Sequence, residues 1–124
     1  MRAAIRSLLT VDYEDPRAFT PEDPTDFLIG LRLTAGPPGE PGEETFDFTV
    51  CTPGWLERKM GSKKVYWPRH HLLISRWDWP QIESYVRGYV AGIEGATWHD
   101  VAMKLSRLGH WEFEDYRPEP EQRS

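Results

Sequence analysis

Three carboxylates near the C-terminus come closest, by their spacing, to a catalytic arrangement. Glu112, Glu114 and Asp115 lie in the run WEFEDY. On an extended strand Glu112 and Glu114 point to the same face, about 7 Å apart, because each residue rises about 3.3 Å. Such a pair can serve as general acid and general base when the surroundings separate the two pKa values. The sequence places no apolar segment against one of them alone. A solvated strand face or an acidic contact surface is therefore favoured over an active site.

The histidines and the single cysteine are not spaced as a metal site or a nucleophilic centre. Cys51 lies within a predicted strand, with no helix N-terminus or glycine elbow to activate it, so a structural thiol is favoured. His70 and His71 are adjacent, and adjacent strand residues point to opposite faces, so they do not suit one ion. Asp100, next to His99, is better explained as a capping carboxylate at a positive helix end. We therefore predict no catalytic residue, metal ligand or cofactor.

Carboxylates coincide with large aromatic side chains at two places in the chain. Tryptophan is enriched at binding hot spots, and its large side chain keeps an N–H donor. We predict a partner-binding surface that consists of Asp78, Trp79, Glu112, Glu114, Asp115 and Tyr116. Trp98 and Trp111 fall on apolar faces instead, and we expect both to be buried.

Four segments have the alternating pattern of strands. They lie near residues 3–13, 27–34, 46–51 and 71–76. In the first segment the inward face is expected to hold Ala3, Ile5, Leu9, Val11 and Tyr13. The segment Gly36–Gly42 is rich in proline and glycine and can form neither helix nor ladder, so we expect an exposed hairpin connection. A short helical turn is expected over residues 54–60.

The second half of the chain has the pattern of two amphipathic helices and a short strand. Apolar residues recur at helical spacing over residues 78–94, with Asp78 as the N-cap. Thr97 and Asp100 are spaced like a capping box for a second helix over residues 97–108, which Gly109 ends. Residues 111–114 alternate again, which predicts a final strand. This order predicts an α+β fold: an antiparallel sheet of at least four strands with the two C-terminal helices on one face.

Size and charge restrict the class of protein. A chain of 124 residues is the usual size of one domain. We assign residues 1–117 to that domain and residues 118–124 to a tail that is disordered by composition. Fifteen basic and twenty acidic residues give a formal charge of −5, which argues against a nucleic-acid partner and permits a basic protein partner. No apolar run approaches the ~20 residues that cross a bilayer. We therefore expect no membrane partner. The single cysteine, Cys51, favours a reducing compartment.

Two motifs support a resemblance to a known family. The run FDFTVCTPGWL spans Phe46–Leu56, and WHDVAMKLSRLGHWEFEDY spans Trp98–Tyr116. Together with the length and the order of the elements, they resemble the immunity protein 8 family of bacterial polymorphic toxin systems, over about residues 3 to 116. The resemblance implies a cytoplasmic protein that binds and neutralises a cognate toxin, without catalysis or cofactor. It supplies no toxin-binding residues.

The leading hypothesis is a stoichiometric inhibitor that occludes a toxin through an acidic surface. Two alternatives stay open: a small enzyme that uses Glu112, Glu114 and Asp115 with a histidine, and a non-catalytic structural subunit. A concave pocket around these carboxylates would favour the enzyme, whereas a flat acidic and aromatic patch would favour the inhibitor. The sequence does not fix the identity of the toxin, the oligomeric state, or whether the Gly36–Gly42 loop takes part in binding.

Overall fold

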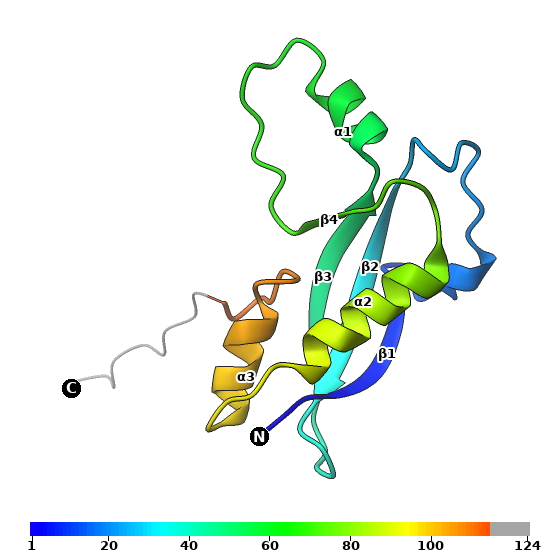
Figure 1. The fold of residues 1–124 in the computed structure, drawn as a ribbon. Helices are drawn as coiled ribbons and strands as arrows, with labels where there is room; N and C mark the ends of the chain where they lie inside the picture. The colour runs from blue at the N-terminus through cyan, green and yellow to red at the C-terminus, as the bar shows by residue number, and fades with distance from the viewer. Residues whose placement is uncertain (115–124) are drawn as a thin grey trace.

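The α+β fold is confirmed by a computed structural model, which describes residues 1–114 (Figure 1). The predicted contact residues Asp115 and Tyr116, the domain boundary at residue 117 and the tail 118–124 lie outside the described residues. The elements in chain order are β1 (Ala4–Thr10), η1 (Pro16–Ala18), β2 (Leu28–Gly36), β3 (Glu44–Cys51), α1 (Pro53–Met60), β4 (His71–Leu73), α2 (Trp79–Ala91) and α3 (Trp98–Leu105).

The four strands form one sheet in the order β1-β2-β3-β4. The first three strands are antiparallel, and the Gly36–Gly42 segment joins β2 to β3 as the expected hairpin connection. β4 pairs parallel to β3, with Thr49 opposite His71, so the sheet is mixed rather than wholly antiparallel. The reason is the long connection over residues 52–70. It leaves the end of β3, returns alongside that strand and begins β4 in the same direction, as a parallel pair requires.

The expected final strand at residues 111–114 is absent from the described structure. The chain instead makes one isolated antiparallel bridge, in which Asp47 and His110 exchange N–H···O bonds of 3.0 and 2.6 Å. A turn follows, closed by the Glu114 N–H donating to the Trp111 carbonyl. Gly109 explains the close approach, because a Cβ there would lie 2.9 Å from the Phe46 carbonyl carbon. The segment touches β3 at one point and then turns Trp111 into the core.

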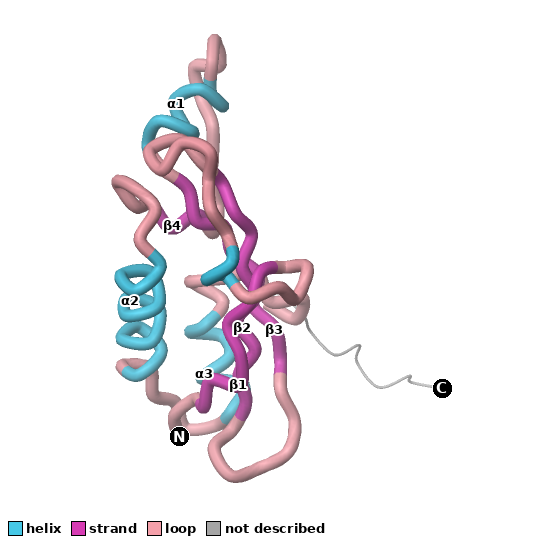
Figure 2. The backbone as a smooth tube through the Cα atoms, turned by 90° about the vertical axis from the view of Figure 1, so that its right-hand side faces the viewer, coloured by secondary structure: helices cyan, strands magenta, loops and turns pink. Residues whose placement is uncertain are grey.

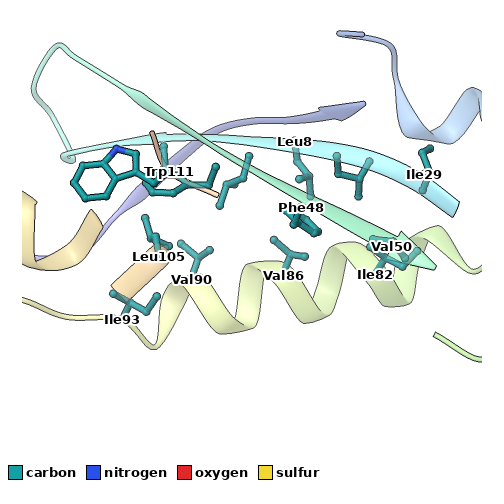
Figure 3. Packing of buried hydrophobic residues seen from close by; sticks show 14 of the residues in the cluster. Leu8, Ile29, Phe48, Val50, Ile82, Val86, Val90, Ile93, Leu105 and Trp111 are labelled. Carbon is teal, nitrogen blue, oxygen red and sulfur yellow. The ribbon is translucent and has the colours of Figure 1, made fainter. Parts of the chain in front are cut away.

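One face of the sheet is covered by α2 and α3, and this layer contact is the hydrophobic core (Figure 3). Both helices lie within their predicted ranges and are shorter than predicted. The predicted N-caps are confirmed: Asp78 accepts from the Gln81 N–H, and Thr97 and Asp100 form a capping box. Trp111 is 4 % exposed, as predicted for a core residue, whereas Trp98 is only partly buried. No helix within residues 1–114 has the length and apolar character needed to span a bilayer.

The inward face of β1 differs from the predicted one. The pairing with β2 shifts register between Ile5 and Ser7, so one extra residue enters β1 there. Because side chains alternate with a period of two, an inserted residue moves every later side chain to the opposite face. Leu8 is consequently buried, while Val11 and Tyr13 are exposed.

Residues 53–70, which comprise α1 and the loop that follows it, extend beyond the sheet (Figures 1 and 2). We call this segment the arm. Its helix begins at Thr52, whose hydroxyl accepts from the Trp55 N–H at 3.3 Å, and ends at Gly61, where φ is +52°. None of the residues of α1 is buried. The arm therefore contributes little to the core.

Candidate partner-binding surfaces

The two halves of the predicted partner-binding surface lie at opposite ends of α2. Asp78 caps the first turn of that helix. Trp111, which leads into Glu112 and Glu114, packs near the last turn (Figure 3). The helix has 13 residues, so it is about 20 Å long. Asp78 and the C-terminal carboxylates therefore cannot form one small patch.

Trp79 does not provide the exposed aromatic surface that was expected. Its side chain is 7 % exposed and belongs to the core cluster. Its indole stacks on Trp77, with ring centroids 6.3 Å apart. The buried face of α2 begins directly after the N-cap Asp78, at Trp79 itself, and continues with Ile82.

Glu114 is engaged within the molecule. Its carboxylate forms an ion pair with Arg69, and the Glu114 side chain is 18 % exposed. This pair ties the end of the arm to the C-terminal segment. The charge of Glu114 is therefore compensated, in contrast to that of Glu112, which is exposed.

Glu112 lies in a groove with two carboxylates that the sequence analysis did not identify. The groove has a volume of about 230 Å³ and is lined by Glu43, Glu44, Thr45, Trp111, Glu112 and Phe113. We call it the acidic groove. The Trp98 Nε1–H donates to the Glu44 carboxylate at 2.9 Å, which holds one wall in place. The groove forms because the Asp47–His110 bridge brings the C-terminal segment beside the start of β3. No periodicity in the sequence signals that bridge.

The arm has the opposite chemistry. It contains the basic residues Arg58, Lys59, Lys63, Lys64 and Arg69 and only one acidic residue, Glu57. The rest of the chain therefore holds ten basic and nineteen acidic residues. In the loop that follows α1, Val65 is 86 % exposed and Trp67 is 82 % exposed. No other large apolar side chain of the described residues reaches this exposure.

A second groove lies where the arm rejoins the body. It has a volume of about 250 Å³ and is lined by Pro68, His70, His71, Leu72, Tyr85, Tyr89, Arg107 and Leu108. We call it the root groove. His70 has a φ of +57°, an unusual backbone conformation for a residue other than glycine. Its Nε2 lies 2.8 Å from the Ser106 carbonyl oxygen, which can only accept, so Nε2 carries the proton. That bond fixes the turn between the arm and β4.

The polar groups of the described residues form no recognisable catalytic or metal centre. Within residues 1–114 no cluster of three His, Cys, Asp or Glu side chains is placed to hold a metal ion. Cys51 is fully buried, and burial raises the pKa of its thiol, which keeps it protonated. The Arg32–Asp47 pair on the outer sheet face is bidentate, at 2.7 and 2.8 Å, and also binds the Tyr13 hydroxyl. Hydrogen bonds to Asp47 raise the pKa of Arg32 further, so this pair stays charged and structural.

Comparison with known proteins gives a family but no individual relative. The search of curated proteins found no match, and neither did the search of solved structures. The model of the immunity protein 8 family matches residues 3–116, which is nearly the whole chain. This match spans both motifs, Phe46–Leu56 and Trp98–Tyr116. The chain therefore belongs to the immunity protein 8 family.

Proposed function

We propose that this protein neutralises a cognate toxin by binding it stoichiometrically, without catalysis, and that the acidic groove is part of the contact. The observation that carries the proposal is the acidic groove of a chain that belongs to an immunity family. Glu43, Glu44 and Glu112 stand there beside the side chain of Phe113, which is 37 % exposed, whereas Trp111 lines the groove with an almost wholly buried indole. Carboxylates at the rim of an interface attract a basic partner, and aromatic groups at its centre hold it.

The acidic groove is concave around Glu112, the shape that would favour the alternative of a small enzyme, but its side chains do not suit acid–base catalysis. Acid–base catalysis by a carboxylate pair needs two groups whose surroundings separate their pKa values. Glu114 is held by Arg69, while Glu112 lies at the surface of a shallow groove. No histidine lines the acidic groove. Glu114 therefore acts as an ion-pair partner and Glu112 as an exposed charge, and the two do not form a catalytic pair.

A titration distinguishes stoichiometric inhibition from enzymatic inactivation. The cognate toxin would be held at a fixed concentration far above the dissociation constant of the complex. Purified immunity protein would then be added in steps. A binder abolishes toxin activity at a fixed molar ratio. An enzyme that modifies the toxin would abolish it at ratios far below one, given time, and that result would overturn the proposal.

The role of the acidic groove is tested by charge reversal at its exposed rim. Glu112→Lys should slow association several-fold at low salt and reduce the salt dependence of the rate, because rim charges act mainly on the encounter. Glu22→Lys is the matched control, since it makes the same charge change at an exposed position in the loop before β2. Surface plasmon resonance over a range of salt concentrations gives both rates. Equal association rates for the two variants would remove the groove from the interface.

A further inference from the structure

We infer that the arm is the central anchor of the toxin interface, with Trp67 inserting into an apolar pocket that the toxin rims with acidic groups. The inference rests on the proposed function and names its main contact. It also states the charge of the partner's surface: acidic where it meets the arm, and basic where it meets the acidic groove. Exposure, charge and rigidity of the arm carry it.

The exposure of the arm is unusual for apolar side chains. Single exposed apolar residues are common and need no explanation. Here two of them, Val65 and Trp67, stand two positions apart and are each more than four-fifths exposed. Tryptophan is the residue most enriched at hot spots, and truncating such a residue typically removes a large share of the binding energy. In a protein that acts by binding a partner, such an exposed tryptophan is suited to be a binding hot spot.

The charge around Trp67 selects the partner. Lys63 lies over the Tyr66 ring, 5.8 Å from its centroid, so one cation is already arranged against an aromatic face. Lys64 adds a further exposed cation two residues before Tyr66. A complementary pocket needs carboxylates at its rim. Basic and aromatic residues also suit single-stranded nucleic acid. The nineteen acidic residues outside the arm, set against ten basic ones, favour a protein partner.

The arm is held in position before any partner arrives. At its base Arg58 donates to both oxygens of the Asp26 carboxylate, at 3.0 and 2.8 Å. Where the arm rejoins the body, Arg69 pairs with Glu114. Between them the ring of His71 lies 6.4 Å from that of Trp55 and 6.5 Å from that of Tyr66. A pre-ordered loop loses less conformational entropy on binding than a flexible one.

The root groove extends this surface onto the body. Pro68 follows Trp67 directly and lines the groove opposite α2. Tyr85 of α2 lines it as well and is 59 % exposed. An occupant of the root groove would contact both Pro68 of the arm and the exposed ring of Tyr85. The combination of Trp, Tyr and Arg side chains is typical of interface centres.

The test measures toxin binding by Trp67→Ala, with Met103→Ala as the control. Met103 is also an exposed apolar residue, 37 % exposed, and it lies on α3 rather than on the arm. Trp67→Ala should weaken toxin binding at least about thirtyfold, mainly through faster dissociation, whereas Met103→Ala should bind like the parent. Lys63→Glu/Lys64→Glu should weaken binding as well, and more so at low salt. Urea unfolding of each variant confirms that it is folded.

The outcomes separate the inference from the proposed function. If the parent binds the toxin and Trp67→Ala binds equally well, the arm is not the anchor, and the proposed function stands. If the parent does not bind the toxin at all, the proposed function fails and the inference with it. Light scattering that shows a dimeric parent and a monomeric Trp67→Ala protein would assign the arm to a second copy. Binding of a single-stranded RNA oligonucleotide that Trp67→Ala abolishes would assign it to nucleic acid. Either result overturns the inference.

Discussion

Trp111 and Trp67 belong to two regions that place the same kind of side chain in opposite environments. Trp111 is 4 % exposed and packs on Phe46, with ring centroids 6.1 Å apart. Trp67 is 82 % exposed and belongs to the arm. The same residue type is therefore part of the core in one region and part of the exposed surface in the other. A motif that contains tryptophan therefore does not by itself identify a binding site.

The two regions also differ in how their charges are compensated. In the C-terminal segment Glu114 is paired with Arg69, and on β3 Glu44 accepts from the Trp98 indole. In the arm, Arg58 and Arg69 are paired as well, whereas Lys63 and Lys64 between them are exposed to solvent. Charges built into the body are thus partly occupied by structural contacts. We expect substitutions of buried residues to change stability and substitutions of exposed charges to change binding.

The largest expected effect is the loss of stability on truncating Trp111. Trp111→Ala should lower the free energy of unfolding by about 3–5 kcal/mol, because it leaves a large cavity between β3 and α3. Trp67→Ala should stay within about 0.5 kcal/mol of the parent, as exposed substitutions usually do. Urea unfolding measures both. Equal midpoints for the two variants would contradict the division into a core region and a contact region.

The Trp111 site allows a sharper variant. Its buried indole Nε1 has no hydrogen-bond partner among the described residues. Trp111→Phe therefore loses part of the packing but no hydrogen bond, and should cost clearly less than Trp111→Ala. A cost as large as that of alanine would show that the indole N–H does have a partner.

A smaller effect is expected at the N-cap of α3. Thr97 accepts from the Asp100 N–H at 3.2 Å, and the Asp100 carboxylate accepts from the Thr97 N–H at 3.3 Å. Thr97→Ala removes the first of these bonds and should destabilise the protein by about 1 kcal/mol. Thr97→Ser keeps the cap and is the matched control. Thermal unfolding would show a lower midpoint for the alanine variant alone, together with unchanged toxin affinity. An alanine variant that melts with the serine variant would contradict the assigned cap.

Features governed by local chemistry could be predicted from the sequence. The hairpin connection over Gly36–Gly42 and the N-caps of α2 and α3 depend on residue types that determine the conformation of their own neighbourhood. The inward residues of β2 also follow, because Ile29, Leu31 and Leu33 alternate without interruption. Burial of Trp111 was predicted for a strand that the described structure does not form. The large apolar side chain of Trp111 was enough to predict its burial in the core.

Features that depend on contacts between distant segments could not be predicted in this way. The extra residue near Arg6 reverses the faces of β1, and nothing in the local pattern marks it. The parallel pairing of β4 depends on the path of residues 52–70. The acidic groove joins Glu43 and Glu44 to Glu112 through a single bridge at His110. Of the arm, only a short helical turn over residues 54–60 was predicted, because the exposure of Trp67 depends on the path of the loop that follows this turn.

The smallest expected effect concerns the ion pair at the base of the arm. Hydrogen bonds from Arg58 hold the pKa of Asp26 below its usual range. A carboxyl group whose folded pKa is lowered contributes stability above its unfolded pKa of about 4, and this contribution is lost as the pH falls through the lower folded value. The pair is exposed, so breaking it should hardly move the midpoint of global unfolding. Its effect should appear locally, in the titration of Asp26.

NMR titration of the aspartate carboxyl groups tests this local effect. In Arg58→Met the pKa of Asp26 should rise towards the ordinary value for an aspartate. Asp23 provides an internal control, because its pKa is lowered chiefly by the hydrogen bond from the Thr25 backbone N–H, which the substitution leaves in place. An unchanged Asp26 in the variant would show that Arg58 does not hold the base of the arm in solution. The arm would then be less ordered than the binding argument requires, and Trp67 would lose a larger part of its binding energy to conformational entropy.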